Sequence, residues 1–321
     1  MSSANKVMTM QEAISKYVHD GDRIVFGGFV TNRKPYAAVH EIIRQKKKDL
    51  YLQGGPGGGD TDMLIGAGCV KVLFNSYMAN SGYTQVSRRF RAAIEEGRIL
   101  WEDFSLDVQP IMYHMAALGL PYVPVKNMLG SSLETEWGIS QEQYDADPKL
   151  PPTKLKVAEN PFVPGDKVCL LPTPELDVAI IHAQKAAADG TCRIDGSLFI
   201  DVDIAMGATN CIITCEEIVH PDELRQEPWR NQLPKVVADA VVEVPYGAHP
   251  SQCTNFYDYD GMFYRMYDKV SKTQEDFDAF LDEYIYGTKD HNEYLDKLGA
   301  SHLLGLRVKS GYGYVPGLKR R

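Results

Sequence analysis

The sequence predicts an α/β protein with an open, mostly parallel sheet, helices on both faces and a smaller strand-rich region. Short apolar runs alternate with amphipathic helical patterns over the first 131 residues. This alternation is typical of a parallel sheet that is covered on both sides. A proline-rich stretch then interrupts the pattern, and further apolar runs follow residue 167. We therefore expect one domain in three sections: an α/β half (1–131), an irregular excursion (132–167), and the remaining sheet with C-terminal helices (168–321).

The first helix begins at a capping box, in which Thr9 is the N-cap and Glu12 follows three residues later. Apolar side chains then recur on one helical face as far as Val18. A polar turn leads into the strand Arg23–Phe26, and Pro35 suits the first position of the second helix.

The other elements follow from the same two periodicities and from glycines that end helices. In the first half, we expect strands at 50–53, 70–76 and 100–101, and helices at 60–65, 83–96 and 108–118. After the excursion, we expect strands at 168–171, 178–181, 211–215 and 240–242, a tight turn at 189–191, and acidic helices over 274–298.

Two glycine-rich turns each follow a predicted strand, about 25 residues apart. The first contains Gly28 and Phe29, and the second contains Gly54, Gly55 and Gly57. Because the carboxyl ends of parallel strands share one edge, the turns should line one crevice with backbone N–H groups. Such groups suit an anion or a developing oxyanion. A glycine cluster is equally often a plain turn, and neither one matches a dinucleotide or phosphate-loop fingerprint.

Polar side chains lie near these turns. Arg33 and Lys34 precede a helix and would form a receptor for a carboxylate or phosphate, although a solvated surface is an equal alternative. Ser81 follows the third strand and would orient a substrate or cap a helix. The sequence does not decide whether Arg88 faces the crevice or solvent.

Other residue types give weaker signals. Glu216 and Glu217 form an acid pair at a strand end, which is more often structural than catalytic. His182 and His249 are isolated in the sequence, and His114 is interpreted as a core histidine. No nucleophilic triad and no metal site are expected, because the cysteines lack metal-ligand spacing.

Composition excludes several classes of protein. The net charge of −9 argues against general nucleic-acid binding. No apolar run reaches membrane-spanning length, and the first residues lack the pattern of a signal peptide. Six cysteines without a disulfide pattern fit a reducing compartment, so we expect a cytoplasmic protein.

The segment 20–29, with Pro35 after it, resembles the signature of the α subunit of family I CoA-transferases. It departs from the general pattern at Arg33, where that pattern has glycine, and this version is similar to the members of the family that act on glutaconate. Further similar stretches are 63–66, 79–82, 86–91, 116–121, 136–140, 178–184, 214–218 and 245–253.

The resemblance implies an enzyme of two related subunits, α and β, that form a higher heteromer. In this family the nucleophile is a glutamate of the β subunit, which attacks the acyl-CoA thioester, and CoA passes through an anhydride and a glutamyl-CoA thioester. The family's glutamate motif is absent here, so no catalytic residue is expected in this chain. CoA and acyl-CoA would be substrates, and no cofactor would be bound permanently.

The resemblance also assigns roles at the turns. Gly54 and Gly55 would lie across the subunit interface from the glutamate, and Arg33 or Arg88 would hold the far carboxylate of a short dicarboxylate. Leu106 replaces a usually polar residue, which argues against the chemistry of related ring-cleaving hydrolases. The alternatives are a CoA-ester hydrolase or decarboxylase, and a non-catalytic scaffold subunit.

Overall fold

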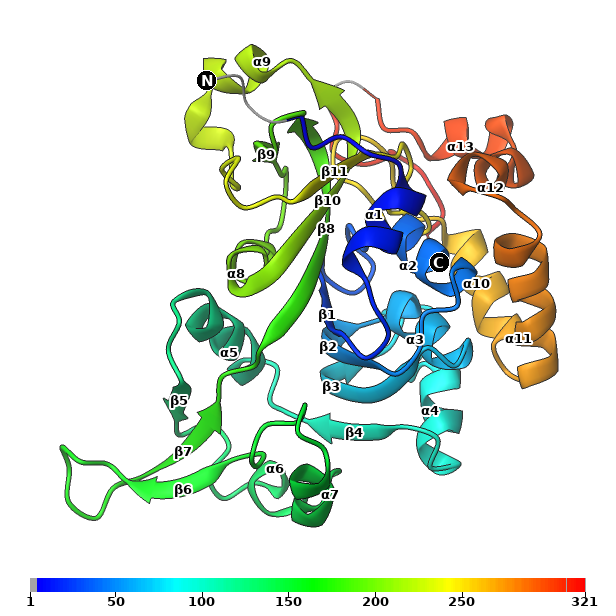
Figure 1. The fold of residues 1–321 in the computed structure, drawn as a ribbon. Helices are drawn as coiled ribbons and strands as arrows, with labels where there is room; N and C mark the ends of the chain where they lie inside the picture. Colours follow the sequence, from blue (N-terminus) through cyan, green and yellow to red (C-terminus); the bar gives the residue numbers. More distant parts are fainter. Residues whose placement is uncertain (1–4, 310, 321) are drawn as a thin grey trace.

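The computed structural model describes residues 5–309 and 311–320 and contains a central, mostly parallel sheet (Figure 1). The strand order is β11-β10-β8-β1-β2-β3-β4, and a short strand, β9, pairs antiparallel with β8. The strands are β1 (Arg23–Phe26), β2 (Leu50–Gly57), β3 (Val70–Met78), β4 (Leu100–Asp103), β8 (Leu176–Ala187), β9 (Cys192–Arg193), β10 (Ala208–Val219) and β11 (Ala240–Glu243). The expected open, mostly parallel sheet is confirmed.

Helices cover both faces of this sheet (Figure 1). One face carries α1 (Met10–Tyr17), α2 (Tyr36–Arg44), α3 (Gly59–Gly66) and α4 (Arg88–Glu95), with α10 (Gly261–Val270), α11 (Gln274–Leu281), η2 (Asp282–Tyr286), α12 (His291–Leu298) and α13 (Ala300–Leu306) outside them. The other face carries α5 (Val108–Ala117) and α8 (Asp201–Gly207). The short helices α9 (Pro221–Gln226) and η1 (Pro228–Arg230) follow β10. Separate apolar clusters fill the two layers, as a sheet buried on both faces requires.

The predicted capping box is confirmed at the start of α1. The Glu12 N–H donates to the Thr9 hydroxyl (3.2 Å), and the Thr9 N–H donates to the Glu12 carboxylate (2.9 Å). None of the helices among the described residues has both the length and the apolar character that crossing a membrane requires. All six cysteines are buried and unpaired.

The smaller strand-rich region is a three-stranded antiparallel sheet of order β5-β7-β6, which extends away from the central sheet (Figure 1). It consists of β5 (Tyr122–Val125), β6 (Lys156–Glu159) and β7 (Lys167–Pro172), with the short helices α6 (Ser132–Thr135) and α7 (Gln141–Ala146). The excursion is therefore partly regular, contrary to expectation. The apolar run 168–171 lies in this small sheet rather than in the central one, because β7 pairs with β5 and β6.

Two predicted boundaries are wrong. The helix expected from Tyr83 begins only at Arg88, because the Ser87 N–H donates to the Met78 carbonyl (3.0 Å) and the preceding residues form turns. The second glycine segment is not a loop after β2. It continues that strand as far as Gly57 and pairs with the end of β3 through two register shifts.

Candidate functional site

The carboxyl ends of β1, β2 and β3 lie side by side at one edge of the sheet, because these strands are parallel neighbours. The segments after them touch one another. The Gly59 N–H donates to the Asn80 side-chain oxygen (2.7 Å), and a Cβ at Gly58 would lie 3.1 Å from the Val30 carbonyl oxygen. The expectation that the two glycine segments adjoin is therefore confirmed. Their close approach requires glycine at position 58.

The first glycine turn satisfies its own backbone. The Gly27 N–H donates to the Ile180 carbonyl (2.9 Å), the Gly28 N–H to the Asp201 carboxylate (3.0 Å), and the Phe29 N–H to the Asn32 carbonyl (2.8 Å). Gly28 has a φ of +75°, which favours glycine. These three N–H groups are not directed into a crevice, contrary to expectation. The exposed part of the turn is the Phe29 ring.

Arg33 is completely buried and ion-paired. Its guanidinium donates to both carboxylate oxygens of Asp201 (2.7 and 3.2 Å) and to the carbonyls of His182 (2.7 Å) and Ser197 (2.6 Å), and both charged side chains have no exposed surface. Asp201 thus holds both this cation and the Gly28 N–H. We assign Arg33 to the fold of the turn rather than to a substrate.

Lys34 has a similar structural contact. Its ammonium lies 3.2 Å from the Asp60 carboxylate, and both side chains are buried. Asp60 also accepts the Gly58 N–H (2.9 Å). This ion pair therefore connects the first glycine turn to the second glycine segment.

The second glycine segment is buried in the single chain, from Gly54 to Gly57. Gly55 has a φ of +51°, and a Cβ there would meet only Ile200, at 3.6 Å. Tyr113 lies against this segment: burial raises the pKa of its hydroxyl, and a hydrogen bond with the Gly55 backbone partly opposes that rise. The glycines here shape the backbone beside a buried phenol.

Ser81 and Arg88 lie beyond the end of β3. Ser81 is exposed, and its hydroxyl lies 2.9 Å from the Tyr77 hydroxyl. Arg88 forms a bidentate ion pair with Asp268 (2.7 and 3.0 Å), and its side chain is 38% exposed. Burial alone would raise the pKa of Asp268, but the hydrogen bonds from Arg88 lower it below its ordinary value. Arg88 is thus the accessible cation of the three that the sequence suggested.

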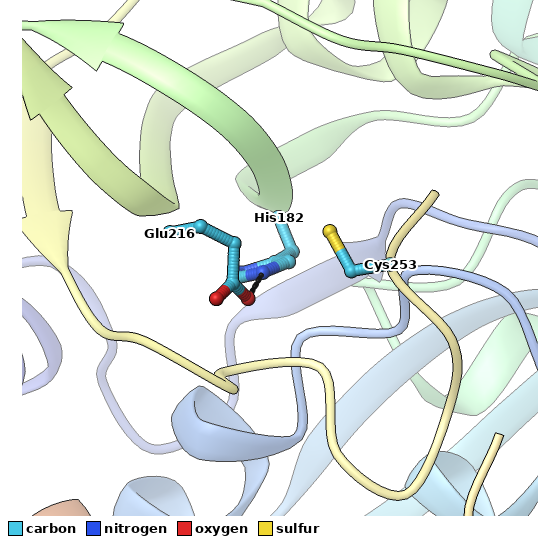
Figure 2. A group of neighbouring side chains, drawn as sticks. All are labelled: His182, Glu216 and Cys253. Atoms are coloured by element: carbon cyan, nitrogen blue, oxygen red, sulfur yellow. Dashed lines mark hydrogen bonds and ion pairs between the residues drawn. The ribbon is translucent and has the colours of Figure 1, made fainter. Parts of the chain in front are cut away.

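Glu216 belongs to a buried hydrogen-bonded group with His182 (Figure 2). Its carboxylate lies 2.7 Å from His182 Nε2 and accepts hydrogen bonds from the Tyr257 hydroxyl (2.6 Å) and the Tyr246 N–H (2.8 Å). A carboxylate with these three partners and 4% exposure cannot reach a substrate. The structural interpretation of Glu216 is confirmed.

Cys253 lies beside this pair (Figure 2), and the ligand atoms of Cys253, His182 and Glu216 lie within 4.8 Å of one another. Burial raises the pKa of the Cys253 thiol well above its ordinary value. A buried thiol of this kind is a poor nucleophile and a poor metal ligand. The group is therefore best described as a polar core at the ends of β8 and β10.

The sequence interpretation of the histidines was partly wrong. His182 is not isolated, because it faces Thr214 in the β8–β10 register and Glu216 lies two residues further on the same face. That spacing of two was the available signal. His114 is not a core histidine: its side chain is 53% exposed and lies 2.9 Å from Asp203.

Comparisons with known proteins identify the family. The model of the family described as coenzyme A transferase matches residues 7–244. The chain is 57% identical to the α subunit of glutaconate CoA-transferase from Acidaminococcus fermentans, over 97% of each chain, and 36% identical to the α subunit of 3-oxoadipate CoA-transferase from Pseudomonas knackmussii, over 91% of this chain and 98% of that one. A crystal structure of glutaconate coenzyme A-transferase from A. fermentans superposes with a TM-score of 0.95 and 58% identity, covering 96% of this chain and 98% of that one. The chain therefore belongs to the coenzyme A transferase family.

Proposed function

We propose that the chain is the α subunit of a heteromeric CoA-transferase, which moves CoA between an acyl-CoA such as acetyl-CoA and glutaconate or a similar short dicarboxylate. The observation that carries this proposal is 57% identity, over 97% of each chain, to a subunit with the same activity in its name. The partner is the corresponding β subunit. CoA and its esters act as substrates.

The acidic groups of this chain support a nucleophile on the partner. The second glycine segment contains no glutamate, and the nearby Asp60 is buried against Lys34. Glu216 is committed to three hydrogen-bond partners. The reaction that fits is attack by a partner glutamate on the thioester carbonyl, which expels the CoA thiolate and forms an acyl-glutamyl anhydride. The thiolate then attacks the glutamyl carbonyl, which releases the carboxylate product and leaves a glutamyl-CoA thioester.

The second half of the reaction reverses these steps with the acceptor. The acceptor carboxylate attacks the glutamyl-CoA thioester and forms a second anhydride, and the released thiolate attacks its acyl carbonyl. Each step passes through a tetrahedral oxyanion in a cavity that must exclude water, since water would hydrolyse the anhydrides. We infer that the backbone at Gly54, Gly55 and Gly57 lines this cavity when the two chains assemble. One oxyanion donor is typically worth about 3–4 kcal/mol.

Substrate contacts from this chain would come from the exposed groups at the same edge. Phe29 presents an apolar ring, Ser81 a hydroxyl, and Arg88 a half-exposed cation for the far carboxylate. Gly28 contributes by shaping the turn. Arg33 and Lys34 act indirectly, by fixing the two glycine segments through Asp201 and Asp60.

The test is transfer of CoA from glutaryl-CoA to acetate by the chain purified together with its β subunit. We expect new acetyl-CoA without net release of CoA, and a hydroxylamine-sensitive acyl group on the partner polypeptide. Release of free CoA without an acceptor would indicate a hydrolase, and loss of CO₂ a decarboxylase. An acyl group on Glu216 or Glu217 would overturn the assignment of the nucleophile. Transfer by the isolated β subunit would reduce this chain to a scaffold.

A further inference from the structure

Three side chains that the proposed reaction does not use converge on one carboxylate oxygen. His249 Nε2 lies 2.9 Å from Asp260 Oδ2, and His302 Nε2 contacts the same oxygen. The three ligand atoms all lie within 4.8 Å of one another. The residues come from the loop after β11, from the N-cap of α10 and from α13, so the sequence gives no spacing signal for them.

The charge of this group lacks compensation. Asp260 is 1% exposed and has no lysine or arginine partner among the residues that the structure describes. An ionised carboxylate at such depth needs a nearby positive charge, because its desolvation is costly. Either a protonated imidazole or a bound cation can supply that charge. The other buried acids of the glycine segments, Asp201 and Asp60, have arginine or lysine partners instead.

The surroundings of the group orient it as a set of ligands. The second oxygen of Asp260 accepts the Phe263 N–H (2.9 Å), and His249 Nδ1 lies 2.7 Å from the Tyr294 hydroxyl. Metal-binding imidazoles and carboxylates are typically held by such outer hydrogen bonds, which fix the ring and leave the other donor atom for the ion. His302 completes the set from the surface, with 32% of its side chain exposed.

We propose that His249, Asp260 and His302 bind one divalent transition-metal ion of the zinc class. Two imidazoles and a carboxylate are a typical zinc ligand set, with water at the fourth position. Tetrahedral zinc would separate its ligand atoms by roughly 3.3 Å, so small movements of the His302 ring would admit the ion. The ion replaces hydrogen bonds that both imidazoles now make to Asp260.

The site would brace α13 and the first glycine turn. The loop that carries His249 also accepts the Arg33 N–H at the Gln252 carbonyl (2.8 Å) and the Lys34 N–H at the Ser251 hydroxyl (3.0 Å). An ion held by His302 would tie this loop to α13. Its effect is on stability, and it does not depend on the identity of the CoA substrates.

The experiment measures metal binding by the purified two-subunit protein after removal of metal with a chelator. We expect about one Zn²⁺ per chain on reconstitution, a Co²⁺ spectrum typical of four-coordination, and a higher midpoint of thermal unfolding with Zn²⁺. His302→Asn should weaken Co²⁺ affinity by roughly tenfold or more and abolish the thermal response. The matched control is His114→Asn, which removes the histidine of an exposed His–Asp pair and should change neither result.

Two results would overturn the proposal. One is wild-type protein that binds no Zn²⁺ or Co²⁺, which would leave the three residues as a hydrogen-bonded group with a protonated imidazole. The other is equal binding by wild type and His302→Asn, which would place the metal elsewhere. The readouts are binding and stability, so failure of the proposed transferase activity would not affect them.

Discussion

Replacing Arg33 by methionine distinguishes a structural role from a substrate-binding role. The guanidinium and the Asp201 carboxylate have no exposed surface, and they meet through two hydrogen bonds. Without Arg33, the Asp201 carboxylate would keep only the Gly28 N–H as its described partner. Breaking a buried ion pair by removing one partner costs about 3–5 kcal/mol, because the remaining charge is uncompensated. This is a large fraction of the total stability of about 5–15 kcal/mol of a typical domain.

The assay is urea denaturation, with a double-mutant cycle between Arg33 and Asp201. We expect Arg33→Met and Asp201→Leu each to reduce the free energy of unfolding strongly. The double variant should lose clearly less than the sum, since neither charge remains buried alone. Arg230→Met is the matched control, because the Arg230 pairs with Glu227 and Asp195 are exposed to solvent and should contribute little.

Substrate kinetics provide the opposing result. If Arg33 only holds the turn, folded Arg33→Met should change KM for the dicarboxylate and for acetate by similar factors. Wild-type stability combined with a selective rise in KM for the dicarboxylate would refute this reasoning. Arg33 would then have to reach the substrate in the assembled enzyme.

Three further variants test other parts of the structure. Burial raises the pKa of Asp62 to about 6, so its folded form favours the proton, and stability should fall as pH rises from about 4 to above 6. Asp62→Asn should remove this fall, which is worth up to about 3 kcal/mol, when urea denaturation is compared at both ends of the range. Gly27→Ala would place a Cβ 2.2 Å from Asp201 Oδ1 and should cost about 1–3 kcal/mol, whereas Gly305→Ala, with open space around it, should not destabilise. Folded Glu216→Gln should still place the acyl group on the partner, and a missing acyl group would contradict its structural assignment.

The sequence predicted the central sheet because its signals are local. Strand and helix periodicities alternate over the first half, and the capping box at Thr9 and Glu12 marks the first helix start. The neighbouring positions of the glycine segments then follow from topology, since parallel strands end at one edge. That part of the site needed no knowledge of side-chain contacts.

The small sheet was harder to predict because its strands lack a local signal. β5 contains a proline, and β6 is almost wholly exposed to solvent, so neither shows the pattern of a buried strand. Their pairing through β7 joins segments that are far apart in the chain. Likewise, β2 continues through Gly54 to Gly57, although glycine is normally depleted in strands.

The partners of the buried cations could not be predicted, for the same reason of distance. Asp201 lies 168 residues beyond Arg33, and it belongs to a short helix on the other face of the sheet. A pair of cations before a helix is an equally good pattern for an anion receptor and for two structural ion pairs. Only the positions of Asp201 and Asp60 decide between these alternatives.

These ion pairs explain how a chain without a reactive carboxylate would contribute to the proposed reaction. Replacing a buried ion pair by apolar side chains is often neutral or stabilising, so such pairs are weak evidence for stability. Here they occur where position matters, since Asp201 fixes the Gly28 N–H and Asp60 fixes the Gly58 N–H. Both glycine segments are thereby held in defined backbone conformations before any partner binds. The proposed cavity needs this rigidity, because an oxyanion donor displaced by even a small distance loses much of its effect on the transition state.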